Sequence, residues 1–417
     1  MQHLSHVWTR VTDLVAERAE GVYLYAADGR RYLDFSSGIG VTNTGHNHPQ
    51  VVAAAKAQID KLIHGQMNVL YNRPVLDLVA ELLTIVPNGL DRFFFSNSGA
   101  EAVEAAFKLA RQATRRPNVI AFQGAFHGRS IGALSLTSSN SKFRAGYQPL
   151  MAGVFIAPYP YAYRYGWTPE ETSAFCLQEI RHMLATQTAP QETAAVLIEP
   201  VLGEGGYVPS PPAFLEGLQQ LCAEHDILLI VDEIQSGFGR TGRWFACQHY
   251  PVQPDIVVMA KGMASGFPLS GIATREKIMD AWQPGAHGGT FGGNAVSCAA
   301  AAATVRTIRE EGLLENGLQM GRYLTDRLRV MQSQYPVLGD VRGLGLMIAA
   351  EFTNDNGQPD ADAARAVRLK CLEGGLILLT CGSYSNVIRW IPPLTVNRSQ
   401  IDEAFKIFEE ALAFISS

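Results

Sequence analysis

Short apolar runs alternate with amphipathic stretches through the first three quarters of the chain. Residues 99–114 and 213–225 carry apolar side chains at the spacing of a helix with one buried face. Between such stretches, runs rich in apolar and β-branched residues predict buried strands at 92–96, 118–122, 194–200, 227–233 and 255–260. This alternation predicts an α/β fold with a mainly parallel sheet, in which ligand sites lie beyond the carboxyl ends of the strands.

The pattern changes after about residue 295. A long helical region is followed by an apolar run at 341–352, a helix near 361–373, apolar runs within 376–380 and 386–393, and a closing helix at 399–414. Few strands interleaved with helices indicate a smaller α+β domain. Residues 21–38 alternate like a β-hairpin, which we expect to pack against that domain. We predict an N-terminal segment at 1–50, a large domain at 51–305 and a small domain at 306–417.

Composition narrows the class of protein. The chain of 417 residues has 34 lysines and arginines against 39 aspartates and glutamates, without long blocks of one sign, so we expect neither nucleic acid nor a membrane as partner. No apolar stretch has the length of a membrane span or the form of an export signal. The six cysteines contain no C-x-x-C pair. We therefore expect a cytoplasmic protein with reduced thiols and no metal site.

Two predicted strands end in residues suited to a ligand. The strand at 92–96 leads into a helix at Gly99 and Ala100, where unpaired amides and the hydroxyl of Ser98 could hold an anion, although an ordinary helix cap explains the same residues. Asp232 and Glu233 end another strand, and a carboxylate buried there needs a partner. Asp232 continues the alternation of its strand, so we expect it to face a ligand.

Lys261 follows the strand at 255–260 in the small-residue stretch AKGMASG. This setting offers little apolar surface for a lysine stem, which argues against a lysine that extends along the protein surface to solvent. An amine, a carboxylate and an anion cradle at neighbouring strand ends are the parts that hold pyridoxal phosphate. The amine forms a Schiff base, the carboxylate keeps the ring nitrogen protonated, and the amides bind the phosphate.

The strand at 118–122 is followed by a further group of candidate residues. Phe126 could stack on a pyridine ring, and Arg129 offers a forked donor to a carboxylate. His127 has no second metal ligand at a useful spacing, so on its own it is interpreted as a structural histidine.

Gly237, Gly239 and Gly242 have the G-x-G-x-x-G spacing of a dinucleotide site. They neither follow a strand directly nor open a helix, which argues against that interpretation. We expect the segment to be a mobile or partner-contacting loop. A nucleotide-binding dehydrogenase and a non-enzymatic binding module are alternatives, but neither explains the lysine, the aspartate and the anion cradle together.

Six segments of the chain resemble one family: SNSGAEAVEAAFKLAR, FHGRSIGALSLT, IEPVLGEGG, VDEIQSGFGRTGRWFA, AKGMASGFPLSG and GGTFGGNAVSCAAA. In this order, over nearly the whole chain, they are similar to the class III aminotransferases, which are pyridoxal-phosphate enzymes of fold type I. SSGIGVTNTGHNHP and LTCGSYSNVIRWIPPLTV resemble most closely the 4-aminobutyrate aminotransferases. The resemblance implies a homodimer with shared active sites, and it leaves assembly into a tetramer open.

The resemblance also implies roles for single residues. Lys261 and Asp232 would be catalytic, with Lys261 moving a proton at the cofactor and Asp232 pairing with its ring nitrogen. The further implied cofactor contacts are Ser98, Gly99 and Ala100 at the phosphate, Phe126 and Ile234 on the ring faces, Gln235 near the phenolic oxygen, His127, and Thr290, which would reach the other subunit's cofactor. The implied substrate-binding residues are Ile39, Arg129, Glu204 and Arg389.

The implied reaction moves the ω-amino group of 4-aminobutyrate, or of a similar ω-amino acid, to 2-oxoglutarate, giving a semialdehyde and glutamate. Arg129 would bind the carboxylate of the ω-amino acid, and Arg389 would bind the α-carboxylate of glutamate. Glu204 would pair with Arg389 when the donor has no α-carboxylate, because a buried guanidinium without a partner is costly.

Two points about the substrate stay open. Trp390 stands where the family usually has a smaller aliphatic residue, which we expect to affect the length or bulk of the donor. Acetylornithine, 5-aminovalerate or lysine as donors, and racemisation of amino acids, are alternatives within the same family.

Overall fold

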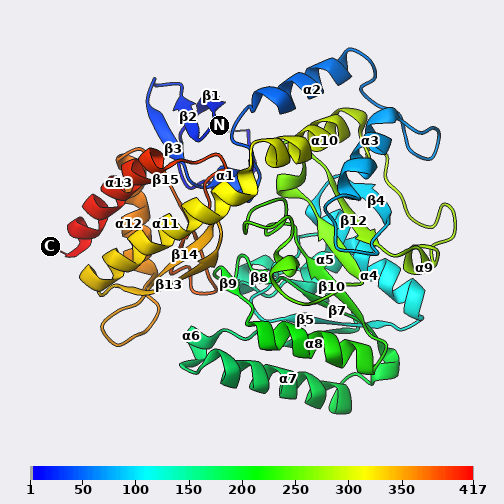
Figure 1. The fold of residues 1–417 in the computed structure, drawn as a ribbon. Helices are drawn as coiled ribbons and strands as arrows, with labels where there is room; N and C mark the ends of the chain where they lie inside the picture. The colour runs from blue at the N-terminus through cyan, green and yellow to red at the C-terminus, as the bar shows by residue number, and fades with distance from the viewer. Residues whose placement is uncertain (1–2, 417) are drawn as a thin grey trace.

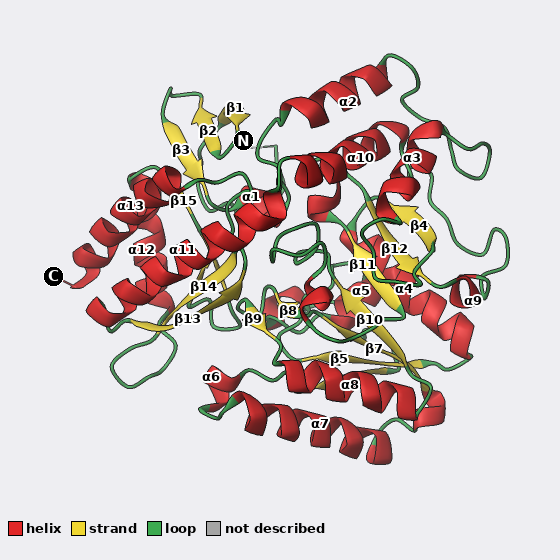
Figure 2. Cartoon of the chain, viewed as in Figure 1, coloured by secondary structure: helices red, strands yellow, loops and turns green. Residues whose placement is uncertain are grey.

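A computed structural model describes residues 3–416, and its largest element is a seven-stranded sheet (Figures 1 and 2). The strand order is β4-β12-β11-β10-β7-β5-β6. The strands from β11 to β6 run parallel, whereas β12 is antiparallel to both of its neighbours. The predicted α/β fold with a mainly parallel sheet is confirmed. The strands are β4 Arg92–Ser96, β5 Asn118–Phe122, β6 Val154–Ala157, β7 Thr193–Ile198, β10 Leu228–Asp232, β11 Ile256–Met259 and β12 Ser270–Thr274.

Two strands of this sheet are absent from the sequence prediction. The five predicted strands are confirmed, with ends that differ by at most two residues. β12 reads SGIAT, which has a single large apolar side chain, and β6 is a four-residue strand at the edge of the sheet. β12 lacks the apolar run on which the prediction rests, whereas the run VFIA of β6 is as long as that of β11, so β6 could have been predicted.

Helices cover both faces of the sheet, so its central strands β7 and β11 are buried along their whole length. Along β7, Ala195 and Leu197 pack in one cluster with α4, whereas Val196 and Ile198 join a second cluster with α8. α7 lies against α8 (Figure 1). The helices are α1 Ser37–Gly40, α2 Pro49–Ile59, α3 Arg73–Leu82, α4 Gly99–Thr114, α5 Ile131–Leu136, α6 Ala162–Tyr165, α7 Pro169–Thr186, α8 Pro212–Glu224 and α9 Glu276–Met279.

Short elements complete this part of the chain. β8 Val201–Leu202 and β9 Val208–Pro209 pair as a small antiparallel hairpin. The 3₁₀ turns are η1 Ser141–Phe143, η2 Pro190–Glu192, η3 Ala246–His249 and η4 Lys261–Ala264.

The C-terminal part combines antiparallel strands with helices, as predicted. The long helical region is two helices, α10 Ala295–Glu310 and α11 Leu313–Gln334, which are separated at Gly312 with φ +64°. The strand order of the second sheet is β13-β14-β17-β16. The predicted domain boundary between residues 305 and 306 lies inside α10 and stays a prediction. The remaining elements are β13 Leu338–Leu344, β14 Met347–Phe352, α12 Ala361–Glu373, β16 Leu379–Cys381, β17 Val387–Trp390 and α13 Arg398–Ser416.

The N-terminal strands lie against the C-terminal part of the chain, and β2 and β3 pair antiparallel. β1 Ala16–Glu20, β2 Tyr23–Ala26 and β3 Arg31–Asp34 form a sheet that β15 Leu376–Ile377 completes. β15 runs parallel to β3, with Leu376 opposite Leu33. Figure 1 shows these blue strands beside the orange and red C-terminal helices.

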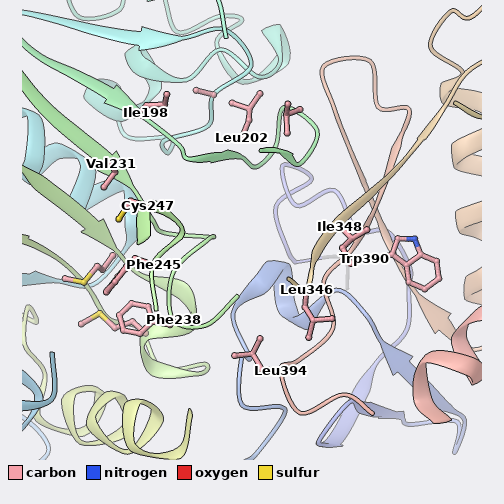
Figure 3. Packing of buried hydrophobic residues seen from close by; sticks show 14 of the residues in the cluster. Ile198, Leu202, Val231, Phe238, Phe245, Cys247, Leu346, Ile348, Trp390 and Leu394 are labelled. Atoms are coloured by element: carbon pink, nitrogen blue, oxygen red, sulfur yellow. The ribbon is translucent and has the colours of Figure 1, made fainter. Parts of the chain in front are cut away.

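The glycine-rich segment at 237–242 is buried, so the prediction of a mobile or partner-contacting loop is wrong. The guanidinium of Arg240 is fully buried and donates to the carbonyl oxygens of Leu346 and Pro392 and to the side-chain oxygen of Asn43. Figure 3 shows Phe238 of this segment in the same view as Leu346 and Leu394. A methyl group on Gly239 would lie 2.7 Å from Cδ1 of Leu394, so glycine lets this segment pack closely against the C-terminal part.

Three further features concern the chain as a whole. All six cysteines are free and buried. Within residues 3–416, no helix has the length and apolar character needed to cross a membrane. In the same range, no group of three or more histidine, cysteine and acidic residues is arranged to hold a metal ion.

Candidate active site

A cavity of about 330 Å³ lies beyond the carboxyl ends of β5, β7, β10 and β11. This is the edge of the sheet at which the strand pattern predicts a ligand site. Nine of the predicted site residues line it: Gly99, Ala100, Phe126, His127, Glu204, Asp232, Ile234, Gln235 and Lys261.

Lys261 follows β11 and opens the turn η4 in the left-handed region, with φ +46°. This conformation costs a residue other than glycine about 1–3 kcal/mol, so the surrounding structure must hold it. Within residues 3–416, the Lys261 amine makes no hydrogen bond or ion pair. Burial lowers the pKa of the amine, and the charge of Glu204 opposes this effect. The side chain is therefore an amine that loses its proton more readily than an ordinary lysine.

Asp232 is the last residue of β10 and is held on both oxygens. Its Oδ2 lies 2.7 Å from Nδ1 of His127, and its Oδ1 accepts a hydrogen bond from the amide of Ile234 at 3.0 Å. Both side chains are buried. Burial disfavours a charged imidazole, but the hydrogen bond and the negative charge of Asp232 outweigh it and raise the pKa of His127. His127 thus lines the cavity and is paired with Asp232, and its predicted contact with the cofactor stays a prediction.

The start of α4 has the unpaired amides that an anion requires. A capping box takes up the first polar groups: Oε2 of Glu101 accepts from the amides of Asn97 and Ser98, and Oγ of Ser98 accepts from the amide of Glu101. No oxygen of residues 3–416 accepts a hydrogen bond from the amides of Gly99 and Ala100. Both residues line the cavity, and their amides remain free for a ligand.

Phe126, Ile234 and Gln235 provide the remaining walls. Phe126 and Ile234 are apolar and line the cavity, as expected for residues beside a planar ring. The side-chain oxygen of Gln235 is buried without a hydrogen-bond partner. A buried polar atom of this kind requires a partner that the protein does not supply, which indicates a polar ligand.

Arg389 and Glu204 form an ion pair at the side of the cavity. Nη1 of Arg389 lies 2.5 Å from Oε1 of Glu204. Burial raises the pKa of Glu204, but the charge of Arg389 outweighs it, so that the pKa lies below its usual value. The same pairing raises the pKa of Arg389 against the effect of burial. Both groups are therefore charged in the absence of substrate.

Trp390 does not reach this cavity, so the expectation that it affects the size of the donor is wrong. It is fully buried and packs against Phe35, Phe405 and Phe408. Figure 3 shows its ring beside Ile348, its partner across the sheet. Successive residues of a strand point to opposite faces, so Arg389 on the cavity side places Trp390 in the core.

Five predicted residues do not line the cavity: Ser98, Arg389, Arg129, Ile39 and Thr290. The last three are exposed in the single chain. The guanidinium of Arg129 lies over the ring of Phe143, at 4.7 Å from its centroid. Thr290 was expected at the cofactor of a second subunit, which the single chain does not contain.

The cavity also contains residues that the sequence patterns above do not single out. They include Val41, Glu199, Phe267, Pro268 and Leu269. Glu199 follows β7 directly, so the rule that identifies Asp232, an acid at the end of a buried strand, would also have found it.

The residues present fit pyridoxal phosphate. The cavity brings together an unpaired amine at Lys261, the Asp232 carboxylate, two free amides at the start of α4 and the buried oxygen of Gln235. A methyl group on Gly99 would lie 2.9 Å from Cδ1 of Ile234, so glycine there keeps open the space next to the amides. The fold and this set of groups define a pyridoxal-phosphate-dependent transferase of fold type I.

A family model, aminotransferase class-III, matches residues 4–412, so the chain belongs to the class III aminotransferases. It is 41% identical to the 4-aminobutyrate aminotransferase of Escherichia coli, over 96% of this chain and 94% of that protein. It is also 41% identical to the 5-aminovalerate aminotransferase of Pseudomonas aeruginosa, over 96% and 94%, and to the acetylornithine aminotransferase of Archaeoglobus fulgidus, over 97% and 97%.

Solved structures agree with this family. A thermostable (S)-enantioselective ω-transaminase from Thermomicrobium roseum is similar with a TM-score of 0.94 and 32% identity, covering 100% of this chain and 97% of that one. An amine transaminase from an uncultivated Pseudomonas species, described in its PLP-bound form, has a TM-score of 0.92 and 30% identity, covering 99% and 98%. The chain is therefore a class III ω-aminotransferase that uses pyridoxal phosphate and takes an amino donor and a keto acid acceptor.

Proposed function

We propose that the enzyme moves the ω-amino group of 4-aminobutyrate, or of a similar ω-amino acid, to 2-oxoglutarate. The pairing of Arg389 with Glu204 supports this substrate class most directly. A donor without an α-carboxylate leaves the pair intact, whereas glutamate and 2-oxoglutarate supply a carboxylate that replaces Glu204 on Arg389. One cavity then serves two substrates of different charge without leaving a buried guanidinium unpaired.

Individual residues have separate roles in the proposed reaction. When bound, the cofactor supplies a carbonyl carbon for the Lys261 amine and a ring that takes up electrons from the substrate carbon. Nζ of Lys261 would remove a proton from the substrate carbon and deliver it to the carbonyl-derived carbon of the cofactor. Asp232, fixed by His127 and by the amide of Ile234, holds a proton on the ring nitrogen. Gly99 and Ala100 bind the phosphate, and Arg129 binds the carboxylate of the ω-amino acid.

A panel of amino donors tests the proposal. Each donor is incubated with 2-oxoglutarate, and glutamate formation is followed for 4-aminobutyrate, 5-aminovalerate, acetylornithine and lysine. The highest kcat/KM with 4-aminobutyrate or another unbranched ω-amino acid supports the proposal, and a clear preference for acetylornithine contradicts it. In a second assay without any keto acid, loss of optical activity of an α-amino acid would identify a racemase instead.

We also propose that the enzyme is a homodimer with shared active sites, in which Thr290 contacts the cofactor of the other subunit. In the single chain, Thr290 is exposed together with large apolar side chains such as Val69, Tyr71 and Phe291. The ring of Phe291 lies 5.3 Å from that of His64, in the segment that also holds Val69 and Tyr71, and exposed apolar side chains that lie together favour a protein interface. Light scattering after size-exclusion chromatography distinguishes a monomer, a dimer and a tetramer.

We further propose a cytoplasmic location. All six cysteines are free, which suits a reducing compartment. Fractionation of cells that express the protein, with immunodetection in each fraction, tests this location.

A further inference from the structure

Glu199 is a buried acidic residue of the cavity that has no role in the reaction described above. It follows β7 directly, is 7% exposed and lines the cavity. Among residues 3–416, no lysine, arginine or histidine forms an ion pair with it. Its carboxylate instead joins two loops: Oε1 accepts from the amide of Phe126 at 2.9 Å, and Oε2 accepts from the amide of Gly203 at 2.8 Å.

The loop that begins at Gly203 carries Glu204. The amides of Gly206 and Tyr207 both donate to the carbonyl oxygen of Gly203, at 3.0 and 3.2 Å, which closes a tight turn around Glu204. On its far side, the carbonyl oxygen of Glu204 accepts a hydrogen bond from Gly382 at 2.8 Å. The position of the Glu204 side chain therefore depends on how the Gly203 amide is held.

The contact between Glu199 and this turn is close. A methyl group on Gly203 would lie 2.9 Å from Oε2 of Glu199, so glycine lets the carboxylate approach the backbone. Burial raises the pKa of Glu199 to about 7, against the opposing charge of His127. Both oxygens of this buried carboxyl group accept hydrogen bonds from backbone amides, so the group holds those two amides in place.

We propose that Glu199 is a positioning residue that holds the Glu204 turn in the conformation in which Glu204 meets Arg389. This inference rests on the proposed function, because only a donor without an α-carboxylate needs the Glu204–Arg389 pair. Glu199 then favours ω-amino donors and has little effect on glutamate, for which Arg389 must leave Glu204.

The change Glu199→Gln tests the proposal with the cofactor-loaded enzyme. Glutamine keeps one acceptor oxygen and turns an NH₂ group toward the other amide, so one of the two hydrogen bonds is lost. The two half-reactions are measured separately by stopped-flow absorbance. We expect kcat/KM to fall about 10- to 100-fold for the ω-amino donor, the range for loss of a hydrogen bond to a charged group, and less than about threefold for glutamate.

Two further variants separate positioning from a general structural role. In a Glu204→Gln background, Glu199→Gln should lower ω-donor turnover by less than about twofold, because residues that act through one another are not additive. Gly203→Ala should reproduce the selective loss. Glu224→Gln, which removes an exposed partner of Arg181, is the control and should leave both half-reactions unchanged. Equal losses in both half-reactions, or a full multiplicative loss in the double variant, would overturn the proposal.

Hydrogen exchange gives a readout that is independent of activity. In the cofactor-free chain, Glu199→Gln should speed exchange of a peptide covering residues 200–207, while a peptide within α8 stays unchanged. Unaltered exchange would overturn the proposal even if activity falls. If the wild-type enzyme turns over no ω-amino donor, the proposed function fails, and the exchange measurement still decides whether Glu199 holds the turn.

Discussion

Replacement of Trp390 tests whether this residue serves the core or the donor pocket. Its ring is fully buried, with centroid distances of 5.0 Å to Phe408, 5.1 Å to Phe405 and 5.8 Å to Phe35. We expect substitutions to lower stability without changing the order in which the enzyme prefers its donors.

The expected loss of stability follows from these contacts. Removal of a buried aromatic side chain costs about 3–5 kcal/mol, so Trp390→Ala should lower the free energy of unfolding by that amount. Trp390→Phe keeps one ring and also removes the indole Nε1, which is buried without a hydrogen-bond partner. Because an unsatisfied buried donor costs about 1–3 kcal/mol, its removal offsets part of the lost packing. We expect the change to phenylalanine to cost less than about 2 kcal/mol.

Urea unfolding of the cofactor-free chain, followed by circular dichroism, measures the loss. The control is Trp8→Ala, because Trp8 is 69% exposed and its removal should change the unfolding midpoint little. Ratios of kcat/KM between 4-aminobutyrate and longer or bulkier donors should stay the same in both Trp390 variants. A change of more than about tenfold in these ratios, with a small change in stability, would refute the placement of Trp390.

Four other substitutions probe the cavity itself. Lys261→Ala should lower turnover by at least about 10²–10⁴-fold and leave the circular dichroism of the cofactor-free chain unchanged; normal steady-state activity would contradict the role of the amine. Burial places the pKa of Lys261 in the folded chain below the ordinary 10.5 of the unfolded chain, so between these two pKa values the unfolded chain binds more protons. The free energy of unfolding of the cofactor-free chain should therefore rise with pH between them. Lys261→Met should lose this rise in urea titrations at several pH values. Gly99→Ala should weaken cofactor binding in equilibrium dialysis, because the methyl group would lie 2.9 Å from Ile234, and unchanged affinity would argue against the anion cradle. Glu204→Gln should lower kcat/KM for 4-aminobutyrate about 10- to 100-fold and spare glutamate; equal effects on both would argue against the exchange of partners on Arg389.

The predicted strands carry apolar runs that are visible in their own residues, and the missed strand β6 carries such a run as well. Apart from Thr193 at the start of β7, β7 and β11 are apolar because helices cover both faces of the sheet. β12 is equally buried, but the neighbouring strand β4 restricts the size of its side chains. A methyl group on Gly271 would lie 2.5 Å from the carbonyl oxygen of Phe94. Contact between two strands can require small residues without producing a periodic apolar pattern in either sequence, so β12 could not be predicted.

The same distinction applies to the site. Asp232 and Lys261 are predictable because a charge at the end of a buried strand needs a partner, and that need is visible in the sequence. The partner of Asp232 is not, since His127 comes from a loop more than a hundred residues earlier in the chain. Arg240 is buried because it donates to carbonyl groups that are distant in the sequence. These contacts cannot be seen in the sequence, so the glycine-rich segment is predicted to be a mobile loop although it lies inside the protein.

Lys261 differs from the other basic groups around the cavity because it has no acidic partner of its own among residues 3–416. Asp232 meets His127, Glu204 meets Arg389, and both oxygens of Glu199 accept from backbone amides. Each acid near the lysine therefore has a closer partner, and only more distant charges offset the cost of burying a protonated amine. Arg389 keeps its proton at any physiological pH, and His127 is held by Asp232. The Lys261 amine is thus the group that becomes neutral and nucleophilic, as bonding to a carbonyl carbon requires.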